Sequence, residues 1–556
     1  MKDILNSILS LATKSSAETK STQNLTWLNE LSQVDDIQRL NISSTHVNRI
    51  HQDATLSNVE KISLLSSIAE VNLYSANEQV KYFSKLDYVK ADVAKQVIES
   101  NYHYHRSLFL ALDRLIKSIF TDKKNQKSNR LIKIILIMRA LIAAIHMLKW
   151  RFFEHSSAPA NIYLDTSVLY QLASSEQLHK LESQPYKTWP NTTIENLLLH
   201  LFILGNLNFN DISKLTIENI SKLLTLWTAG IETSTEPENQ HTFFINLNQD
   251  LAAQRLRKKS TKTKGLYWDM DNIEAKIEET IETISVMGLK NRDLILNALD
   301  IDNADNFNQT LLLLKQEWSR IDYNRERRLE ARSKVKKQAQ VNVGIRSVCE
   351  LLSQISLNTA STKSLIDEDL LELKRSRPNL VMRGYTNTLI AGKEKWAITD
   401  ESSKGLGTLT SDHYQSQIAL HILVSILISK PQAIPIICAV RNITRTTNDE
   451  LKIGLEIISQ QPKVATLKRY ILANESDATA QKKQEKLFES PHFTAIYIPA
   501  DSELDLADNL IMPKVEYMAK ALYEITFNNK KQMIKLGQLL ESGDDWIQVT
   551  FSAPSL

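Results

Sequence analysis

The period of the hydrophobic pattern changes near Arg332, from the spacing of helices to the spacing of strands. Ahead of that point, apolar residues recur every three or four positions, as in Ile62–Val71, which follows a capping box formed by Ser57 and Glu60. After it, Val335–Val343 alternate between largely apolar and polar side chains, which is typical of a half-buried strand. The sequence therefore predicts helices before Arg332 and β structure after it.

The most apolar stretch of the helical part, Leu131–Trp150, predicts a long buried helix. It contains Lys133 and Arg139, and charges inside a bilayer cost about 2.5–3.5 kcal/mol each. We therefore expect no transmembrane segment here. A second capping box, Thr192 with Glu195, predicts another helix further along, and no fixed repeat period is visible.

A break at Glu236–Glu238 ends the regular helical pattern. Thr242–Leu247 and Gly265–Met270 are candidates for short strands, and a run of basic residues lies between them. This run is either a solvated loop or a segment that contacts an anionic membrane or partner surface. Helical spacing returns over about 272–330. We expect a helical domain over 1–230, a mixed linker domain over 231–324, a β-barrel over 325–465 with an insertion at 345–390, and a C-terminal β extension over 466–556.

Strand candidates crowd the last third of the chain. Besides Val335–Val343 they are Glu394–Thr399, Ile434–Ile443, Leu451–Ile458, Phe493–Ile498, Ala521–Phe527 and Trp546–Phe551. Many short strands favour an antiparallel sheet closed into a barrel, because closure removes exposed strand edges. A helix is expected at Ile345–Ile355, inside the insertion. The fold class is therefore α+β and multidomain, with an all-helical N-terminal region ahead of a β-barrel.

Composition excludes several classes of function. The chain has 67 basic and 64 acidic residues, a net charge of +3, so it gives no global reason to expect a nucleic-acid polymer as partner. Its two cysteines, Cys349 and Cys438, lie far apart in apolar segments, which predicts reduced, buried thiols and no disulfide framework. The first residues lack a signal-peptide pattern. We expect a cytoplasmic protein.

No catalytic or metal-binding pattern stands out. Phosphate-loop, nucleophile-elbow and HExxH motifs are absent from the sequence. His103 and His105 lie two positions apart, so on a helix they point to different faces and cannot share an ion. His146 is expected to be a packed core histidine, and the acids around Asp300 lack the calcium-loop pattern. We therefore expect no enzyme, no catalytic residue, no metal and no cofactor.

Two short motifs carry the functional hypothesis. Arg328 and Arg332 form an RxxxR pattern directly before the alternating strand. Asp400, Ser402 and Gly405 form a DxSxxG pattern directly after the strand candidate that contains Trp396-Ala397-Ile398-Thr399. Each motif alone is weak, but their order, each at the matching end of a strand, is more specific.

This pairing resembles the PilZ domain family, whose RxxxR and [D/N]xSxxG elements grip cyclic di-GMP. Further matches are the turn Gly405–Gly407, the Val-Arg pair ending at Arg441 and the late strand Ile453–Ile457, so that the resemblance covers roughly Arg325 to Pro462. It implies a β-barrel receptor for cyclic di-GMP. The chain departs from compact family members in that 68 positions separate Arg332 from Asp400 (400 − 332).

Physical chemistry supports these residue types as ligand groups. Cyclic di-GMP carries two phosphodiester anions and two guanines. A guanidinium is planar and permanently charged, so Arg328 and Arg332, with Arg327 as an auxiliary, suit phosphate or the O6 and N7 atoms of guanine. Asp400 suits the N1 and N2 donors of guanine, and Ser402 offers a small hydroxyl. Gly405 permits a positive φ or a close backbone approach.

Two functions from different classes remain open. The first is a cyclic di-GMP receptor that passes a signal to an unidentified protein partner through the helical region, in bacterial surface behaviour such as motility, pili or biofilm formation. The second is a degenerate PilZ-like scaffold that binds no nucleotide. The intact motifs favour the first, and the long insertion favours the second. Micromolar or tighter affinity, weakened by Arg328→Ala and Asp400→Ala, is expected of the receptor.

Overall fold

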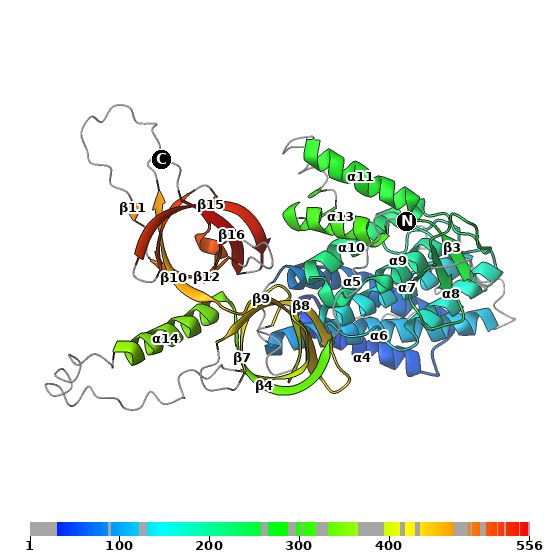
Figure 1. The fold of residues 1–556 in the computed structure, drawn as a ribbon. Coiled ribbons are helices and arrows are strands. Elements are labelled where there is room, and N and C mark those ends of the chain that lie inside the picture. The colour runs from blue at the N-terminus through cyan, green and yellow to red at the C-terminus, as the bar shows by residue number, and fades with distance from the viewer. Residues whose placement is uncertain are drawn as a thin grey trace, which may run out of the picture. The chain divides into compact units, whose positions relative to one another are not determined.

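The chain divides into two compact units, Met1–Arg327 and Arg328–Leu556. The structure, a computed structural model, describes residues 31–86, 91–121, 130–256, 265–286, 296–297, 299–301, 304–318, 332–364, 394–411, 418–428, 434–471, 488–489, 492–500, 508–519, 521–527, 530–543 and 545–553. Figure 1 shows helices in the first unit and two strand-built bodies in the second. The predicted α+β class, with helices ahead of an antiparallel β-barrel, is confirmed.

The first unit is a helical body with one small sheet. Its helical elements are η1 (Leu31–Gln33), α4 (Asp36–Gln52), α5 (Asn58–Lys85), α6 (Ala91–Thr121), α7 (Arg130–Phe153), α8 (Ile162–Ser175), α9 (Ile194–Asn206), η3 (Phe209–Asp211), α10 (Lys214–Trp227), η4 (Thr228–Gly230), α11 (Asp271–Val286) and α13 (Ala304–Trp318). Strands β1 (Phe243–Asn246), β2 (Gln254–Arg255) and β3 (Gly265–Trp268) form a sheet in the order β2-β1-β3. Phe243, Ile273 and Phe307, which come from the predicted linker domain over 231–324, pack in the same hydrophobic core as the preceding helices.

Both predicted helix starts can be checked at their caps. Ser57 and Glu60 form the capping box at α5. At α9 the predicted box is wrong, because the N-cap is Thr193, whose hydroxyl accepts from the backbone N–H of Asn196. Thr192 pairs with Ser183 in an isolated β-bridge instead, which delays the helix by one residue.

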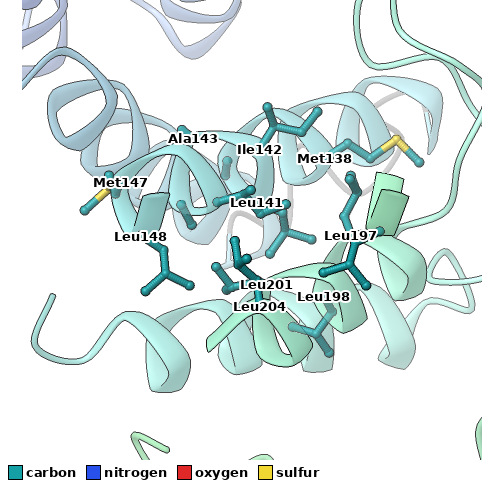
Figure 2. Close-up of a cluster of buried hydrophobic side chains, with 14 of the residues drawn as sticks. Met138, Leu141, Ile142, Ala143, Met147, Leu148, Leu197, Leu198, Leu201 and Leu204 are labelled. Carbon is teal, nitrogen blue, oxygen red and sulfur yellow. The ribbon is translucent and has the colours of Figure 1, made fainter. Parts of the chain in front are cut away.

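Helix α7 is the centre of the first unit. Its apolar side chains interlock with those of α9, as Figure 2 shows for Leu141 and Leu201. Helix α7 is long and apolar enough to span a membrane by length and composition, but 83% of its most apolar window is buried inside the protein. Its buried cations are paired, Lys133 with Glu176 at 2.6 Å. The prediction of a buried helix is confirmed.

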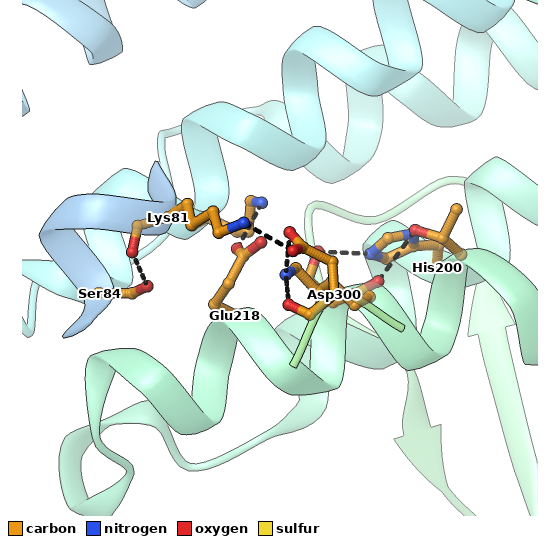
Figure 3. A network of polar contacts seen from close by, with 9 residues as sticks. Lys81, Ser84, His200, Glu218 and Asp300 are labelled. Carbon is orange, nitrogen blue, oxygen red and sulfur yellow. Dashed lines mark hydrogen bonds and ion pairs between the residues drawn. The ribbon is translucent and has the colours of Figure 1, made fainter. Parts of the chain in front are cut away.

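Polar groups also lie inside this helical core. Lys149 Nζ donates to Glu218 at 2.8 Å, and both side chains are buried. The polar contacts drawn in Figure 3 also include the buried His200, which hydrogen-bonds to Ser221 at 3.1 Å, and the exposed Asp300, whose carboxylate pairs with Lys81 at 2.6 Å. Buried ions need such partners, because removal from water costs several kcal/mol per charge.

Two histidines are stacked in the same core. His105 and His146 are buried with nearly parallel rings, their centroids 4.4 Å apart, whereas His103 is exposed. The expectation that His103 and His105 point to different surroundings is confirmed, and so is that of a core position for His146. Burial, reinforced by the nearby Lys149 ammonium, lowers the pKa of His105 and that of His200 to about 3.

The second unit contains two closed rings of strands. The first barrel consists of β4 (Ser333–Val343), β5 (Glu394–Glu401), β6 (Gly405–Ser411), β7 (Leu423–Ile428), β8 (Ile436–Arg445) and β9 (Glu450–Ser459), in the ring order β4-β5-β6-β9-β8-β7. The second barrel consists of β10 (Lys463–Ile471), β12 (Phe493–Ile498), β13 (Asn509–Pro513), β14 (Leu522–Phe527), β15 (Lys530–Ser542) and β16 (Trp546–Ser552), with β11 (Phe488–Glu489) beside β10. A β10–β14 pairing closes this second ring.

The two barrels share one topology. Counted in chain order within each ring, the strands of the first barrel follow the order 1-2-3-6-5-4, and those of the second follow the same order. The sequence predicts a barrel followed by a β extension, and the structure shows that the extension is itself a closed ring. Every strand candidate named above is a strand, whereas β2, β6, β7, β10, β11, β13 and β15 were missed. Gly405–Gly407, expected as a turn, begins strand β6, where these residues pair with β9.

Helix α14 (Ile345–Ser364) begins where the sequence predicts it and packs against the outer walls of both barrels. Its buried face meets Ile437 of the first barrel and Ile511 of the second in one hydrophobic cluster. Asp545 accepts from the backbone N–H of Ile345 at 2.7 Å and so caps this helix from the second barrel. Both cysteines are buried and free, as predicted.

Acid pH is expected to destabilise the helical unit through its buried histidines. The pKa of His105 lies well below its usual 6.5, so the unfolded state binds more protons and stability falls as pH falls from about 6.5 towards 3. We expect His105→Leu to flatten this dependence by on the order of 1 kcal/mol per pH unit. Denaturant unfolding of the full chain, followed by circular dichroism at pH 7.5, 6.5 and 5.5, measures it. His103→Leu, on the exposed face, should keep the original slope; equal slopes in both variants would contradict the assignment.

Candidate functional site

The two sequence motifs meet where β4 pairs with β5. The strands run antiparallel, so the start of β4 lies opposite the end of β5, with Lys334 facing Asp400 across the ladder. Arg332, one residue before β4, reaches the Asp400 carboxylate with Nη1 and Oδ1 2.5 Å apart. The 68 positions between these two residues therefore do not separate them in space. The predicted adjacency of the arginine segment and the acidic motif is confirmed for Arg332.

A β-bulge at Thr399 aims the Asp400 side chain. The β5–β6 register shifts between Ile398 and Asp400, and such bulges redirect a side chain at the edge of a site. The Thr399 hydroxyl contacts Asp400 Oδ2 and the carbonyl of Gly407, each at 3.2 Å. The carboxylate thereby lies over Gly407, where an added Cβ would come within 2.2 Å of Oδ2.

The turn after Asp400 is closed by its own backbone. Ser402 N–H donates to the carbonyl of Gly405 at 2.8 Å, and its hydroxyl lies 3.4 Å from the same oxygen. An added Cβ on Gly405 would meet the Leu455 carbonyl at 2.8 Å and Arg332 Nη2 at 3.3 Å. The close approach of the Leu455 carbonyl and the Arg332 guanidinium explains why residue 405 is a glycine. A positive φ does not explain it, because among the described glycines only Gly344 has one.

Charged side chains frame the site on two sides. Lys337 Nζ pairs with Glu401 at 2.6 Å, next to the Arg332–Asp400 pair. On the other side, Glu456 lies opposite Gly405 in the ladder and accepts from Arg441 at 2.6 Å. These pairs are partly exposed, so they orient groups more than they stabilise the fold.

Glycines remove the side chains of β6 and β9 from the outer wall between these charges, and Gly405 and Gly407 are themselves buried, with the Asp400 carboxylate over Gly407. Three of the 12 glycines of the chain, Gly405, Gly407 and Gly454, lie on neighbouring positions of β6 and β9, with Gly407 facing Gly454. Asn442 of β8 faces Gly454 from the next strand, and its Cβ lies 3.1 Å from where a Cβ on that glycine would stand. On β6 and β9 this part of the wall therefore consists of backbone, bordered by the side chains of Asp400 and Asn442.

Sequence reasoning found some of these residues and missed others. Asp400, Ser402, Gly405 and Arg332 lie together, as predicted. Arg327 and Arg328 lie outside the described residues, so their place in the site stays a prediction. Asn442 was missed, because only the strand order that places β8 beside β9 reveals it.

The site suits a polar ligand that carries both anionic and N–H donor groups. The Arg332 guanidinium supplies fixed donors, while the Asp400 carboxylate supplies acceptors for N–H groups. Among the described residues, no cluster of three or more histidine, cysteine or acidic side chains has the arrangement of a metal site. The residues present offer charge and hydrogen bonding for recognition of such a ligand.

The clash at Gly407 predicts a non-additive pair of substitutions. Gly407→Ala should push the Asp400 carboxylate off Arg332 and cost about 1–3 kcal/mol of unfolding free energy, as overpacking does. Asp400→Ala alone should cost about 1 kcal/mol or less, because its ion pair is partly exposed. Adding Gly407→Ala to Asp400→Ala should then cost little, because the clashing oxygen is gone. A double-mutant cycle by denaturant unfolding measures this, and strict additivity would show that the carboxylate does not occupy this position.

Comparison with protein-family models matches residues 23–238 to the family described as cyclic-di-GMP receptor FimW, N-terminal domain. The matched segment includes neither barrel. No curated protein and no solved structure matches the chain. The resemblance of the first barrel to the PilZ family therefore stays a prediction, while the helical region is similar to the N-terminal domain of a cyclic-di-GMP receptor.

Proposed function

We propose that this protein is a cyclic di-GMP receptor and that the first barrel holds the ligand between Arg332 and the Asp400–Gly405 turn. The observation that carries the proposal is the contact between Arg332 and Asp400, which joins the two motifs on one wall. The family match of residues 23–238 supports it independently, because the matched domain comes from a cyclic-di-GMP receptor. Recognition, and not catalysis, is the proposed activity.

The proposed binding exchanges one ion pair for ligand contacts. Without ligand, Arg332 and Asp400 neutralise each other. A cyclic dinucleotide offers phosphate oxygens to the guanidinium and the N1–H and N2–H groups of guanine to the carboxylate. Hydrogen bonds to charged groups contribute about 1.5–3 kcal/mol each, enough to replace a partly exposed ion pair. Arg327 and Arg328, which precede Arg332 in the sequence, supply further positive charge.

The second barrel is not the proposed binding site, although its strand order is the same. No arginine lies between the end of β9 at Ser459 and the start of β10 at Lys463. The segment 499–508, which joins β12 to β13 in the place of the Asp400–Gly405 turn, contains no glycine. Its proposed role is structural, through α14 and the shared hydrophobic cluster.

We assign the output to the helical region. In this proposal it passes the ligand signal to a protein partner, in the cytoplasm, and the process is bacterial surface behaviour such as motility, pili or biofilm formation. The similarity of this region to part of a receptor supports a role in signalling.

A second candidate is a scaffold that binds no nucleotide. The specific observation in its favour is that Arg332 and Asp400 already satisfy each other, so that the site needs no ligand to balance its charges. The two candidates differ in one measurable property, the affinity for cyclic di-GMP.

Calorimetric titration of the full chain with cyclic di-GMP tests the receptor. We expect micromolar or tighter affinity, weakened about 10- to 100-fold by Arg332→Ala and by Asp400→Asn, because each removes a charge-assisted contact. Arg346→Ala is the matched arginine control, since Arg346 is highly exposed and pairs with Glu350 on α14. Asp449→Asn is the matched acid control in the β8–β9 turn.

Both control variants should bind like the unaltered chain. Folded protein that gives no heat and no thermal shift with cyclic di-GMP would reject the receptor and leave the scaffold. Equal weakening by the control variants would show that the site residues act through stability and not through contact.

A further inference from the structure

Asn442 occupies the side of the glycine surface opposite Asp400, and its role there goes beyond the motif residues. The β8–β9 register shifts between Val440 and Asn442. This bulge turns Asn442 to the outer wall, since Val440 and Ile443 on either side lie in the barrel core. The inference that follows rests on the proposed function and concerns how the ligand is distinguished.

The orientation of the Asn442 amide is set by one neighbour. Thr444 donates from its hydroxyl to Asn442 Oδ1 at 3.2 Å. The acceptor of the amide is therefore used, and the Nδ2 donors have no hydrogen-bond partner among the residues that the structure describes. The wall thus presents a carboxylate acceptor at Asp400 and an amide donor at Asn442.

Asp400 on β5 and Asn442 on β8 flank two paired positions of the wall, one on β6 and one on β9. Asp400 lies over Gly407, Asn442 lies beside Gly454, and these two glycines face each other on β6 and β9. Directly opposed residues of an antiparallel pair have Cα atoms roughly 5 Å apart. The Asp400 carboxylate covers Gly407, whereas Gly454 is half-buried and has no side chain, so a flat ring placed over Gly454 can reach both groups at once.

We propose that Asn442 determines base specificity by donating from Nδ2 to the O6 atom of guanine while Asp400 accepts from its N1–H and N2–H groups. One edge of guanine carries this acceptor next to two donors. Adenine carries a donor, the N6 amino group, next to the N1 acceptor, so it opposes both protein groups. The Asp400 acceptor beside the Asn442 donor therefore forms hydrogen bonds with guanine, whereas with adenine an acceptor would face an acceptor and a donor would face a donor.

Three substitutions in the full chain test this assignment with cyclic di-GMP, cyclic di-IMP and cyclic di-AMP as probes. Asn442→Ala should weaken cyclic di-GMP about fivefold, the effect of one neutral hydrogen bond. It should weaken cyclic di-IMP by the same factor, because inosine keeps O6. Asp400→Asn should lose more affinity for cyclic di-GMP than for cyclic di-IMP, because inosine lacks the 2-amino group.

Asn442→Asp tests base selectivity, a property that would not change if Asn442 had only a structural role. It sets an acceptor against O6, so the ratio of cyclic di-GMP to cyclic di-AMP affinity should fall by tenfold or more while thermal stability stays the same. Asn448→Ala, in the exposed turn of the same hairpin, is the matched control and should leave every affinity unchanged.

An unchanged ratio in Asn442→Asp, with cyclic di-GMP still bound by the unaltered chain, would overturn the role of Asn442 alone. Absence of cyclic di-GMP binding by the unaltered chain would overturn the proposed function and this inference with it.

Discussion

The antiparallel pairing of β4 with β5 is the constraint on which the candidate site depends. It places the start of one strand beside the end of the other, so that Arg332 and Asp400 meet although an insertion separates them in the sequence. An insertion between paired strands costs little, because the entropy of closing a loop grows only with the logarithm of its length. Part of that insertion, α14, is also used to pack the two barrels together. The insertion, taken from the sequence as favouring a degenerate scaffold, is therefore compatible with an intact site.

Local patterns predicted the strand ends, but not what lies beside them. The alternation of Val335–Val343 and the DxSxxG residues follow from neighbours in the sequence, so Arg332, Asp400 and Gly405 were found. Asn442 and Gly454 join the site only through the β9–β8 pairing and its bulge, which are non-local. Closure of the second ring was missed for the same reason, since it rests on β10, whose residues Lys463–Ile471 mix charged and apolar side chains without strict alternation.

In the helical region, by contrast, the sequence predicted the helices but not the polar contacts between their buried side chains. The apolar spacing of α7 was sufficient to place it in the core. The ion pair of Lys149 with Glu218 joins α7 to α10, and the stacked rings of His105 and His146 join α6 to α7. These contacts depend on which helices are neighbours, and helical periodicity does not contain that information. Buried polar groups of this kind specify one packing, because any other arrangement leaves them unpaired.

The wall of the candidate site also belongs to the joint between the two barrels. Glu456 faces Gly405 on one side and holds Arg441 on the other, and Arg441 reaches Glu541 of the second barrel at 2.5 Å. Next to this link, Trp546 of the second barrel donates to the carbonyl of His421 in the first at 2.8 Å. A ligand that displaces Glu456 must therefore also disturb the charges that tie the barrels together. Packed interfaces of this kind shift between discrete arrangements and do not deform smoothly. If the proposed site is occupied, we therefore expect the signal to pass through these same strands.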